Sequence, residues 1–201
     1  MKIIKERMFP TVIYKVNNVL SKKNLGNIKE ILINSHNENP INKWQSESTL
    51  HKLDDFKSLT NSVIELGEHA FDDLKYGYEK FEITEMWANI SKQGDDHPVH
   101  THLNNLFSGV FYIKSDGNAN IRFLDPRPGA NVLSPAIKEF NNENSNICSF
   151  PSIENTMLLF PAWLQHFVPI NNSPHRRISI SFNLMIRGLV GVQGNLQSAE
   201  F

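Results

Sequence analysis

The sequence predicts an α+β protein that is mainly β, in which N-terminal helices support a β-sandwich or barrel. In residues 22–34 and about 55–74, apolar residues recur at helical spacing. From residue 80 onward they alternate with polar residues in short runs that turn residues separate, as in antiparallel strands. The chain has 201 residues, enough for one domain with a sizeable core.

The amino-acid composition argues against several classes of protein. Hydrophobic residues make up 40% and charged residues 20% of the chain, and the net charge of −1 offers no basic stripe for a nucleic acid. A single cysteine excludes an intrachain disulfide, no apolar run is long enough to span a membrane, and the N-terminus does not resemble a signal peptide. We therefore expect a cytoplasmic protein with no nucleic-acid or membrane partner. The oligomeric state, a homodimer included, is left open.

The N-terminal third combines one strand with two helices. Pro10 restricts the first strand to a sheet edge, Ser21 is a suitable N-cap for the first helix, and the second helix has an apolar stripe that can pack on a sheet. The expected order is a strand at 8–16, a helix at 22–34, an irregular polar segment at 35–54 and a helix at about 55–74.

The rest of the chain is expected to form short strands. Asp116-Gly117 is a typical hairpin turn between two of these strands, and residues 126–152 are expected to be irregular. The predicted strands are 81–90, 108–114, 118–124, 156–160, 163–169 and 176–186.

A histidine cluster is the strongest chemical signal. His97, His100 and His102 lie within six residues, and a strand would place His100 and His102 on one face, because side chains alternate with period two. Imidazole is the commonest protein ligand of transition metals. A metal site needs at least one further ligand from elsewhere in the chain.

The last predicted strand and the turn before it supply candidates for the rest of the site. His166 precedes the turn at 171–174 and Arg177 follows it at a similar distance, so the two side chains are expected at the same height along the strands. An arginine in that position could bind a carboxylate beside the metal. One face of the strand is apolar. The other is either a pocket wall or a solvated surface, and its small polar residues favour the pocket wall; this face carries Arg177, Ser179, Ser181 and Asn183.

The order and spacing of these motifs resemble the Fe(II)- and 2-oxoglutarate (2OG)-dependent oxygenases, and more closely a bacterial and phage branch of that superfamily. The resemblance implies a double-stranded β-helix, of jelly-roll or cupin type, with supporting N-terminal helices. It implies one oxygenase domain over 1–201, made of 1–78 (strand and helices), 79–188 (β-helix core) and 189–201 (tail). The matching segments are Phe9-Pro10, Trp87–Asn89, His100–His102, Ser108–Tyr112, Phe123–Arg127, Leu159–His166 and Arg177–Asn183.

The resemblance also implies residue roles. His100 and His166 become Fe(II) ligands, and His102 takes a place that the superfamily normally gives to a carboxylate. The second ligand is therefore either His102 or a carboxylate from elsewhere, for which Asp125 is the best candidate, although an aspartate before proline also suits a plain turn. Arg177, with Ser179, is expected to bind 2OG. The expected pocket or second-shell residues are Asn89, Tyr112, Asn104, Asn183 and His97.

Three functions are compatible with these residues. The first is an oxygenase that uses Fe(II), 2OG and O₂ to hydroxylate a protein or peptide side chain or a small metabolite. The second is a three-histidine cupin-type dioxygenase without 2OG, against which Arg177 speaks. The third is a non-catalytic β-sandwich binding module, against which the histidine cluster speaks. The primary substrate cannot be named from the sequence.

Overall fold

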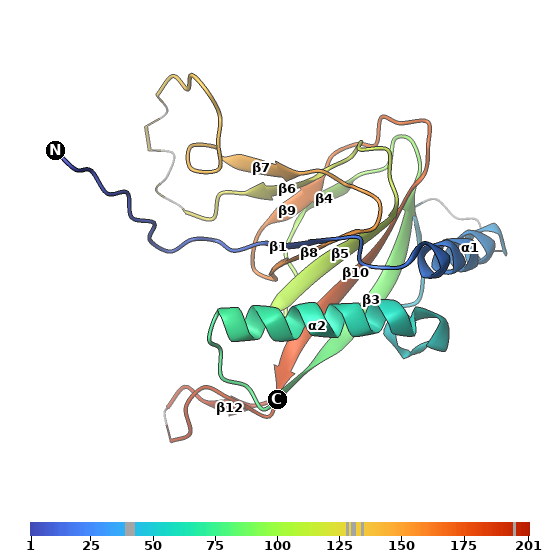
Figure 1. Ribbon diagram of the computed structural model, residues 1–201, viewed down its shortest axis with the longest axis horizontal. Coiled ribbons are helices and arrows are strands. Elements are labelled where there is room, and N and C mark those ends of the chain that lie inside the picture. The colour runs from blue at the N-terminus through green and yellow to red at the C-terminus, as the bar shows by residue number, and fades with distance from the viewer. Residues whose placement is uncertain (39–42, 128, 130–131, 134, 195) are drawn as a thin grey trace.

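The larger of the two main antiparallel sheets forms the centre of the protein (Figure 1). The computed structural model describes residues 1–38, 43–127, 129, 132–133, 135–194 and 196–201. The larger sheet has the strand order β1-β8-β5-β10-β3-β2. Its strands are β1 (Tyr14–Asn17), β2 (Trp44–Gln45), β3 (Lys80–Ser91), β5 (Phe107–Lys114), β8 (Thr156–Pro161) and β10 (Arg177–Arg187).

The smaller sheet faces the larger one and has the order β4-β9-β6-β7. An apolar cluster that includes Tyr112 and Phe160 from the larger sheet and Phe123 from the smaller one joins the two. Two sheets closed around a common interior make the double-stranded β-helix that the sequence predicts. The strands of the smaller sheet are β4 (His97–His100), β6 (Ile121–Leu124), β7 (Ile147–Phe150) and β9 (His166–Val168).

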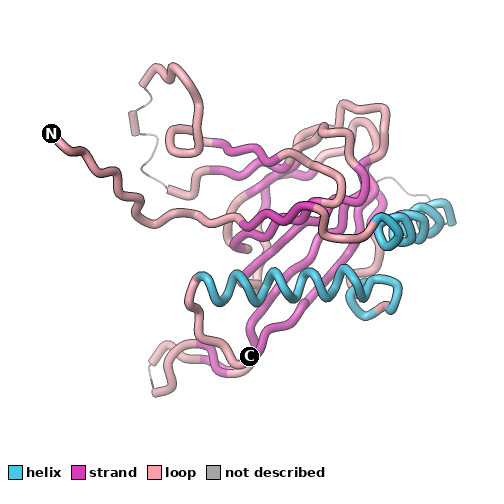
Figure 2. The backbone as a smooth tube through the Cα atoms, in the orientation of Figure 1, coloured by secondary structure: helices cyan, strands magenta, loops and turns pink. Residues whose placement is uncertain are grey.

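Helices α1 (Lys22–Glu38) and α2 (Lys57–Asp73) lie beside the larger sheet and away from the smaller one (Figure 2). Two short 3-10 helices, η1 (Leu50–Lys52) and η2 (Asp54–Phe56), lead into α2. Buried apolar side chains of α1, α2, β3 and β10 form the main core. No helix in the described part of the chain is both long and apolar enough to cross a membrane.

Several predicted elements need correction. The predicted hairpin at Asp116-Gly117 is wrong: β5 pairs with β8 and β10, whereas β6 pairs with β7 and β9. Both edges of β5 are already occupied, so this turn carries the chain from one sheet to the other. Strand β7 lies within the segment expected to be irregular, and the first strand covers only Tyr14–Asn17.

Other boundaries differ by a few residues. Helix α1 extends to Glu38, four residues beyond the predicted end, and the chain after β10 forms a small hairpin of β11 (Leu189–Val190) and β12 (Ala199–Glu200). A close contact explains the glycine in the 108–112 motif. A Cβ atom at Gly109 would lie 2.1 Å from Phe182 Cζ, so the Phe182 ring packs where a side chain would otherwise stand.

Candidate metal and carboxylate site

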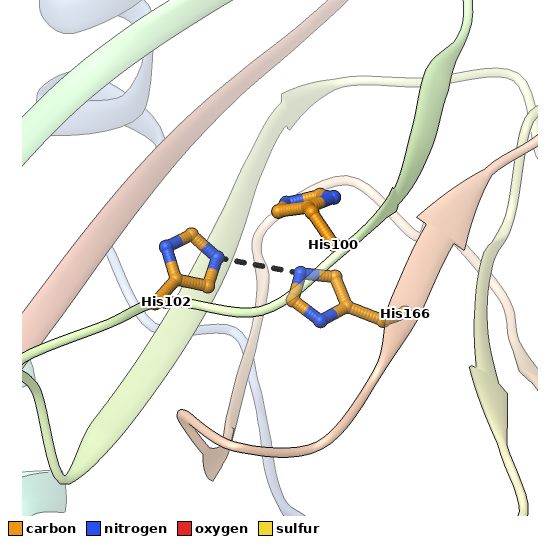
Figure 3. Close-up of side chains that lie close together, drawn as sticks. All are labelled: His100, His102 and His166. Atoms are coloured by element: carbon orange, nitrogen blue, oxygen red, sulfur yellow. Dashed lines mark hydrogen bonds between the residues drawn. The ribbon is translucent and has the colours of Figure 1, made fainter.

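Three histidines converge between the two sheets (Figure 3). His100 ends β4 and pairs in register with His166, the first residue of β9. His102 lies two residues past the end of β4, where its backbone N–H donates to the Ala162 carbonyl at 3.0 Å. The candidate ligand atoms of the three side chains all lie within 4.8 Å of one another. This spacing suits a single metal ion.

Backbone carbonyl groups orient two of the imidazoles. His100 Nδ1 lies 2.7 Å from the Pro98 carbonyl, and His166 Nδ1 lies 2.9 Å from the Leu164 carbonyl. When Nδ1 carries the proton and donates it to a carbonyl, Nε2 keeps a free lone pair, which is the arrangement of a metal-ligating histidine. His166 Nε2 faces His102 Nε2 at 3.3 Å (Figure 3).

The histidines lie in surroundings that disfavour their charged form. Burial, followed by the neighbouring imidazole of His100, lowers the pKa of His102 to about 4. Burial is also the main cause that lowers the pKa of His166 to about 4. The rings of Phe123 and Phe160 pack against His166, with centroid distances of 5.8 and 4.8 Å. Neutral imidazoles bind metals, so this environment keeps both residues ready to act as ligands near neutral pH.

The described residues of the ligand cluster include no carboxylate. Asp125, the alternative ligand, instead forms a bidentate pair with Arg127. Nε of Arg127 donates to Asp125 Oδ1 at 2.9 Å, and Nη2 donates to Asp125 Oδ2 at 2.7 Å. Hydrogen bonding from Arg127 lowers the pKa of Asp125. The carboxylate is therefore engaged in its own turn and not in the histidine cluster.

Arg177 begins β10 and lies in the interior, with 5% of its surface exposed. One of its terminal nitrogens donates to the Ala119 carbonyl at 3.1 Å, but its Nε has no partner among the described residues. The Tyr112 hydroxyl is likewise buried without a described partner. Burial lowers the pKa of Arg177 and raises that of Tyr112 to about 12. Unsatisfied buried donors are costly, and a carboxylate would satisfy both.

The inner face of β10 is polar and mostly buried, so the solvated alternative for this face is wrong. Ser179 pairs in register with Asn89 of β3 and Tyr112 of β5, and all three are buried. Asn183, which is also buried, accepts a hydrogen bond from Ser108 Oγ at 2.7 Å. Three predicted pocket residues, together with Ser179, therefore line one wall of the interior.

The two remaining predicted residues lie at the edge of the site. His97 is half-buried at the start of β4 and outside the three-histidine cluster. Burial, followed by the charge of Arg177, lowers its pKa to about 4. Asn104 is exposed, and its positive φ of 60° places it in a turn.

Glu85 is a site residue that the sequence reasoning missed. Its carboxylate accepts a hydrogen bond from Asn183 Nδ2 at 3.2 Å. It lies on β3, two residues before Trp87, whose ring centroid is 6.1 Å from that of His102. Alternation along 85–91 could have placed Glu85, Trp87 and Asn89 on one face, but no local pattern shows which face points inward.

Known proteins share this architecture. The similar solved structures include the epimerase SnoN from nogalamycin biosynthesis, described as non-heme and alpha ketoglutarate dependent (10% identity, TM-score 0.67, 92% of this chain and 81% of SnoN covered). They also include a prolyl hydroxylase from Trichoplax adhaerens in complex with a hypoxia inducible factor peptide (14%, 0.64, 87% and 83%). A Pseudomonas putida prolyl-4-hydroxylase is a third (12%, 0.62, 89% and 89%). These likenesses identify the fold as the double-stranded β-helix of the 2OG oxygenases.

The sequence itself identifies the family. Residues 85–183 match the model of the family described as "Putative 2OG-Fe(II) oxygenase". The matched segment contains the three clustered histidines and Arg177. This match assigns residues 85–183 to this Fe(II)- and 2OG-dependent oxygenase family. No curated protein sequence matches it significantly.

Proposed function

We propose that this protein hydroxylates a C–H bond of a protein or peptide side chain or of a small metabolite, with Fe(II) bound by His100, His102 and His166 and 2OG bound by Arg177. The observation that carries this assignment is the pairing of a three-histidine cluster with two unsatisfied buried donors on the facing sheet. A non-catalytic sandwich has no need for either feature.

The donor set fits an iron ion. Imidazole is a suitable ligand for Fe(II), and three protein ligands leave coordination positions open for other groups. The Nδ1 contacts of His100 and His166 with backbone carbonyls leave Nε2 of both rings available as the ligand atom. SnoN, of the same fold, has been solved in complex with Fe³⁺ and alpha ketoglutarate, which supports the assignment of such a site here.

The surroundings of Arg177 fit one carboxylate of 2OG. Its Nε and the Tyr112 hydroxyl are donors without described partners, and a carboxylate oxygen accepts from both groups. No acidic side chain forms an ion pair with Arg177 in the described part of the chain. Ser179, in the same buried row as Tyr112, can donate a further hydrogen bond.

Iron with 2OG supplies the oxidising chemistry: O₂ is consumed, 2OG is converted to succinate and CO₂, and one oxygen atom enters a substrate C–H bond. The protein positions and shields these groups. Arg177 and Tyr112 fix the far end of 2OG, and the histidines fix the metal. Phe123 and Phe160 hold the His166 ring and keep water away from that side of it.

The test is succinate formation from 2OG in the presence of Fe(II) and O₂. We expect the wild type to turn over 2OG slowly even without its primary substrate, and His166→Ala and Arg177→Ala to lose at least about 100-fold of that rate, as for groups that bind the metal or the cosubstrate directly. His175→Ala, an exposed histidine outside the cluster, is the matched control and retains the rate. A wild type that neither binds 2OG nor forms succinate contradicts the proposal.

A further inference from the structure

We infer that the primary substrate carries a cationic group, a protonated amine or a guanidinium, on an aliphatic chain, and that Glu85 binds this group at the mouth of the site. The inference rests on the proposed function and adds the substrate class. Four features of the described residues carry it: the way in which Glu85 is held, the strand irregularity beside it, the aromatic side chain next to it and the local charge.

A buried network holds the Glu85 carboxylate in place. Glu85, Asn183 and Ser108 lie opposite one another on β3, β10 and β5. Ser108 Oγ donates to Asn183 Oδ1 at 2.7 Å, and Asn183 Nδ2 donates to Glu85 Oε2 at 3.2 Å. Ser108 and Asn183 are 1% and 2% exposed, whereas Glu85 is exposed. Two buried side chains thus orient one solvent-accessible carboxylate.

A β-bulge lies directly beside this carboxylate, on its N-terminal side along β3. Asn183 pairs with Glu85 and the next residue, Leu184, pairs with Ile83, so Thr84 is the additional residue. Thr84 Oγ1 donates to Asn105 Oδ1 at 2.7 Å, in the loop that follows His102. The bulge reverses the alternation of β3: Ile83 packs in the helix-side core, while Glu85 stays on the face that carries Trp87. Such bulges re-aim side chains next to active sites.

Trp87 connects Glu85 to the histidine cluster. Its ring lies 6.1 Å from the His102 ring, and it is partly exposed. Residues two apart on a strand are separated by roughly 7 Å. Along this face of β3, Asn89 is buried, Trp87 is partly exposed and Glu85 is exposed, so accessibility to solvent rises toward Glu85. An aromatic ring beside a carboxylate is suited to a cation, which gains from both the ring face and the negative charge.

The charges around the site favour a cation at this point. No basic side chain of the described residues forms an ion pair with Glu85, whereas Glu82, three residues earlier on β3, is paired with Arg187 at 2.6 Å. Glu85 is thus an oriented carboxylate whose counter-charge is not supplied by these residues. A substrate cation supplies it.

Exposed apolar side chains next to the histidine cluster suit the aliphatic part of the substrate. The hydrogen bond from His102 N–H to the Ala162 carbonyl brings together the segments that carry Leu103 and Trp163. These two side chains are 78% and 56% exposed. An aliphatic chain that leads to an amine or guanidinium can cover them while its charged end reaches Glu85.

Binding to the holoprotein tests this inference. The protein is loaded with Mn(II) and 2OG, and 2OG binding is measured first by calorimetry. N-acetyl-lysine amide is then titrated against its uncharged analogue N-acetyl-norleucine amide. We expect the lysine probe to bind about tenfold more tightly, as a charge-assisted hydrogen bond allows. Glu85→Gln should remove this preference. Glu82→Gln, whose carboxylate is already paired with Arg187, should keep it and serves as the matched control.

Two further probes distinguish the sources of the cation. A pentapeptide with a central lysine represents a protein substrate, and n-butylamine represents a free amine. If either probe binds the wild type more tightly than Glu85→Gln, the inference is supported. The probe with the higher affinity then shows whether the cation belongs to a protein side chain or to a free amine. Equal binding of the lysine and norleucine probes to wild type, or a preference that survives Glu85→Gln, overturns it. If 2OG itself does not bind, the proposed function fails instead, so the two failures are distinguishable.

Discussion

The two faces of β10 are both buried but differ completely in chemistry. Toward the helices, the strand presents Ile180, Phe182 and Leu184, which are 0% exposed and lie in the main core. Toward the smaller sheet it presents Arg177 and Ser179, which are 5% and 2% exposed. One strand therefore presents an apolar face to the helix-side core and a polar face to the interior between the sheets.

Burial has opposite effects on the free energy of folding at the two faces of β10. The apolar face stabilises the protein through removal of apolar surface from water. The polar face has no such gain, and it keeps the Nε of Arg177 without a partner among the described residues. Burying a donor without a partner costs free energy that a bound ligand can return. We therefore expect substitutions on the first face to change stability and substitutions on the second to change ligand binding.

The largest expected effect is on the apolar face. Phe182→Ala should lower the free energy of unfolding by about 3–5 kcal/mol, the usual cost of truncating a fully buried phenylalanine. Denaturant unfolding of the metal-free protein measures this loss. Ser181→Ala, on the next residue and the opposite face, is the control and should change stability by less than about 1 kcal/mol. If both variants lose the same free energy of unfolding, the two faces of β10 do not differ in their contribution to stability.

The next largest effect concerns His102, the proposed second metal ligand. His102→Ala should weaken binding of Fe(II), or of Co(II) as a spectroscopic substitute, by more than about 100-fold. Loss of a residue that only hydrogen-bonds to a metal ligand costs about 10- to 100-fold, and loss of a ligand itself should cost more. Asp125→Ala should leave the metal affinity unchanged, because that carboxylate is engaged with Arg127. The reverse result would assign the carboxylate as the ligand and reject the three-histidine site.

Arg177→Gln should weaken 2OG binding to the metal-loaded protein by about 100-fold, or about 3 kcal/mol, because a charged hydrogen-bond donor to the carboxylate is lost. Stability without ligand should not fall, since the substitution removes a buried charge that has no acidic partner among the described residues. Calorimetry and thermal unfolding of the same samples measure the two quantities. A variant that unfolds more easily but binds 2OG normally would make Arg177 a structural residue.

The smallest expected effect is that of Ser179→Ala on the polar face. Loss of one neutral hydrogen bond to 2OG should cost about 1 kcal/mol, or roughly fivefold in affinity. Ser179→Thr keeps the hydroxyl and is the conservative comparison. If alanine and threonine variants both bind 2OG like the wild type, Ser179 is a wall of the pocket and not a ligand contact.

Much of the fold could be predicted because its signals are local. The apolar stripe of α2 and the alternation along β3, β5 and β10 follow directly from residue spacing. The partner of each strand is not a local property. The Asp116-Gly117 turn has hairpin chemistry, yet it joins two sheets because both edges of β5 pair with strands far away in sequence. The cytoplasmic location, the domain limits and the residue roles stay predictions.

The sequence by itself determined the class of protein and its main chemical groups. His100, His102, His166 and Arg177 could be selected from spacing and from the family resemblance, since these residue types are rare and chemically distinctive. Only the tertiary structure decided how the groups are used. In the folded protein, Asp125 pairs with Arg127, and Asn183 donates a hydrogen bond to Glu85. The Nε of Arg177 and the Tyr112 hydroxyl have no partner among the described residues. Each of these outcomes depends on which face of a strand is turned inward and on contacts between distant segments, which no single stretch of sequence encodes.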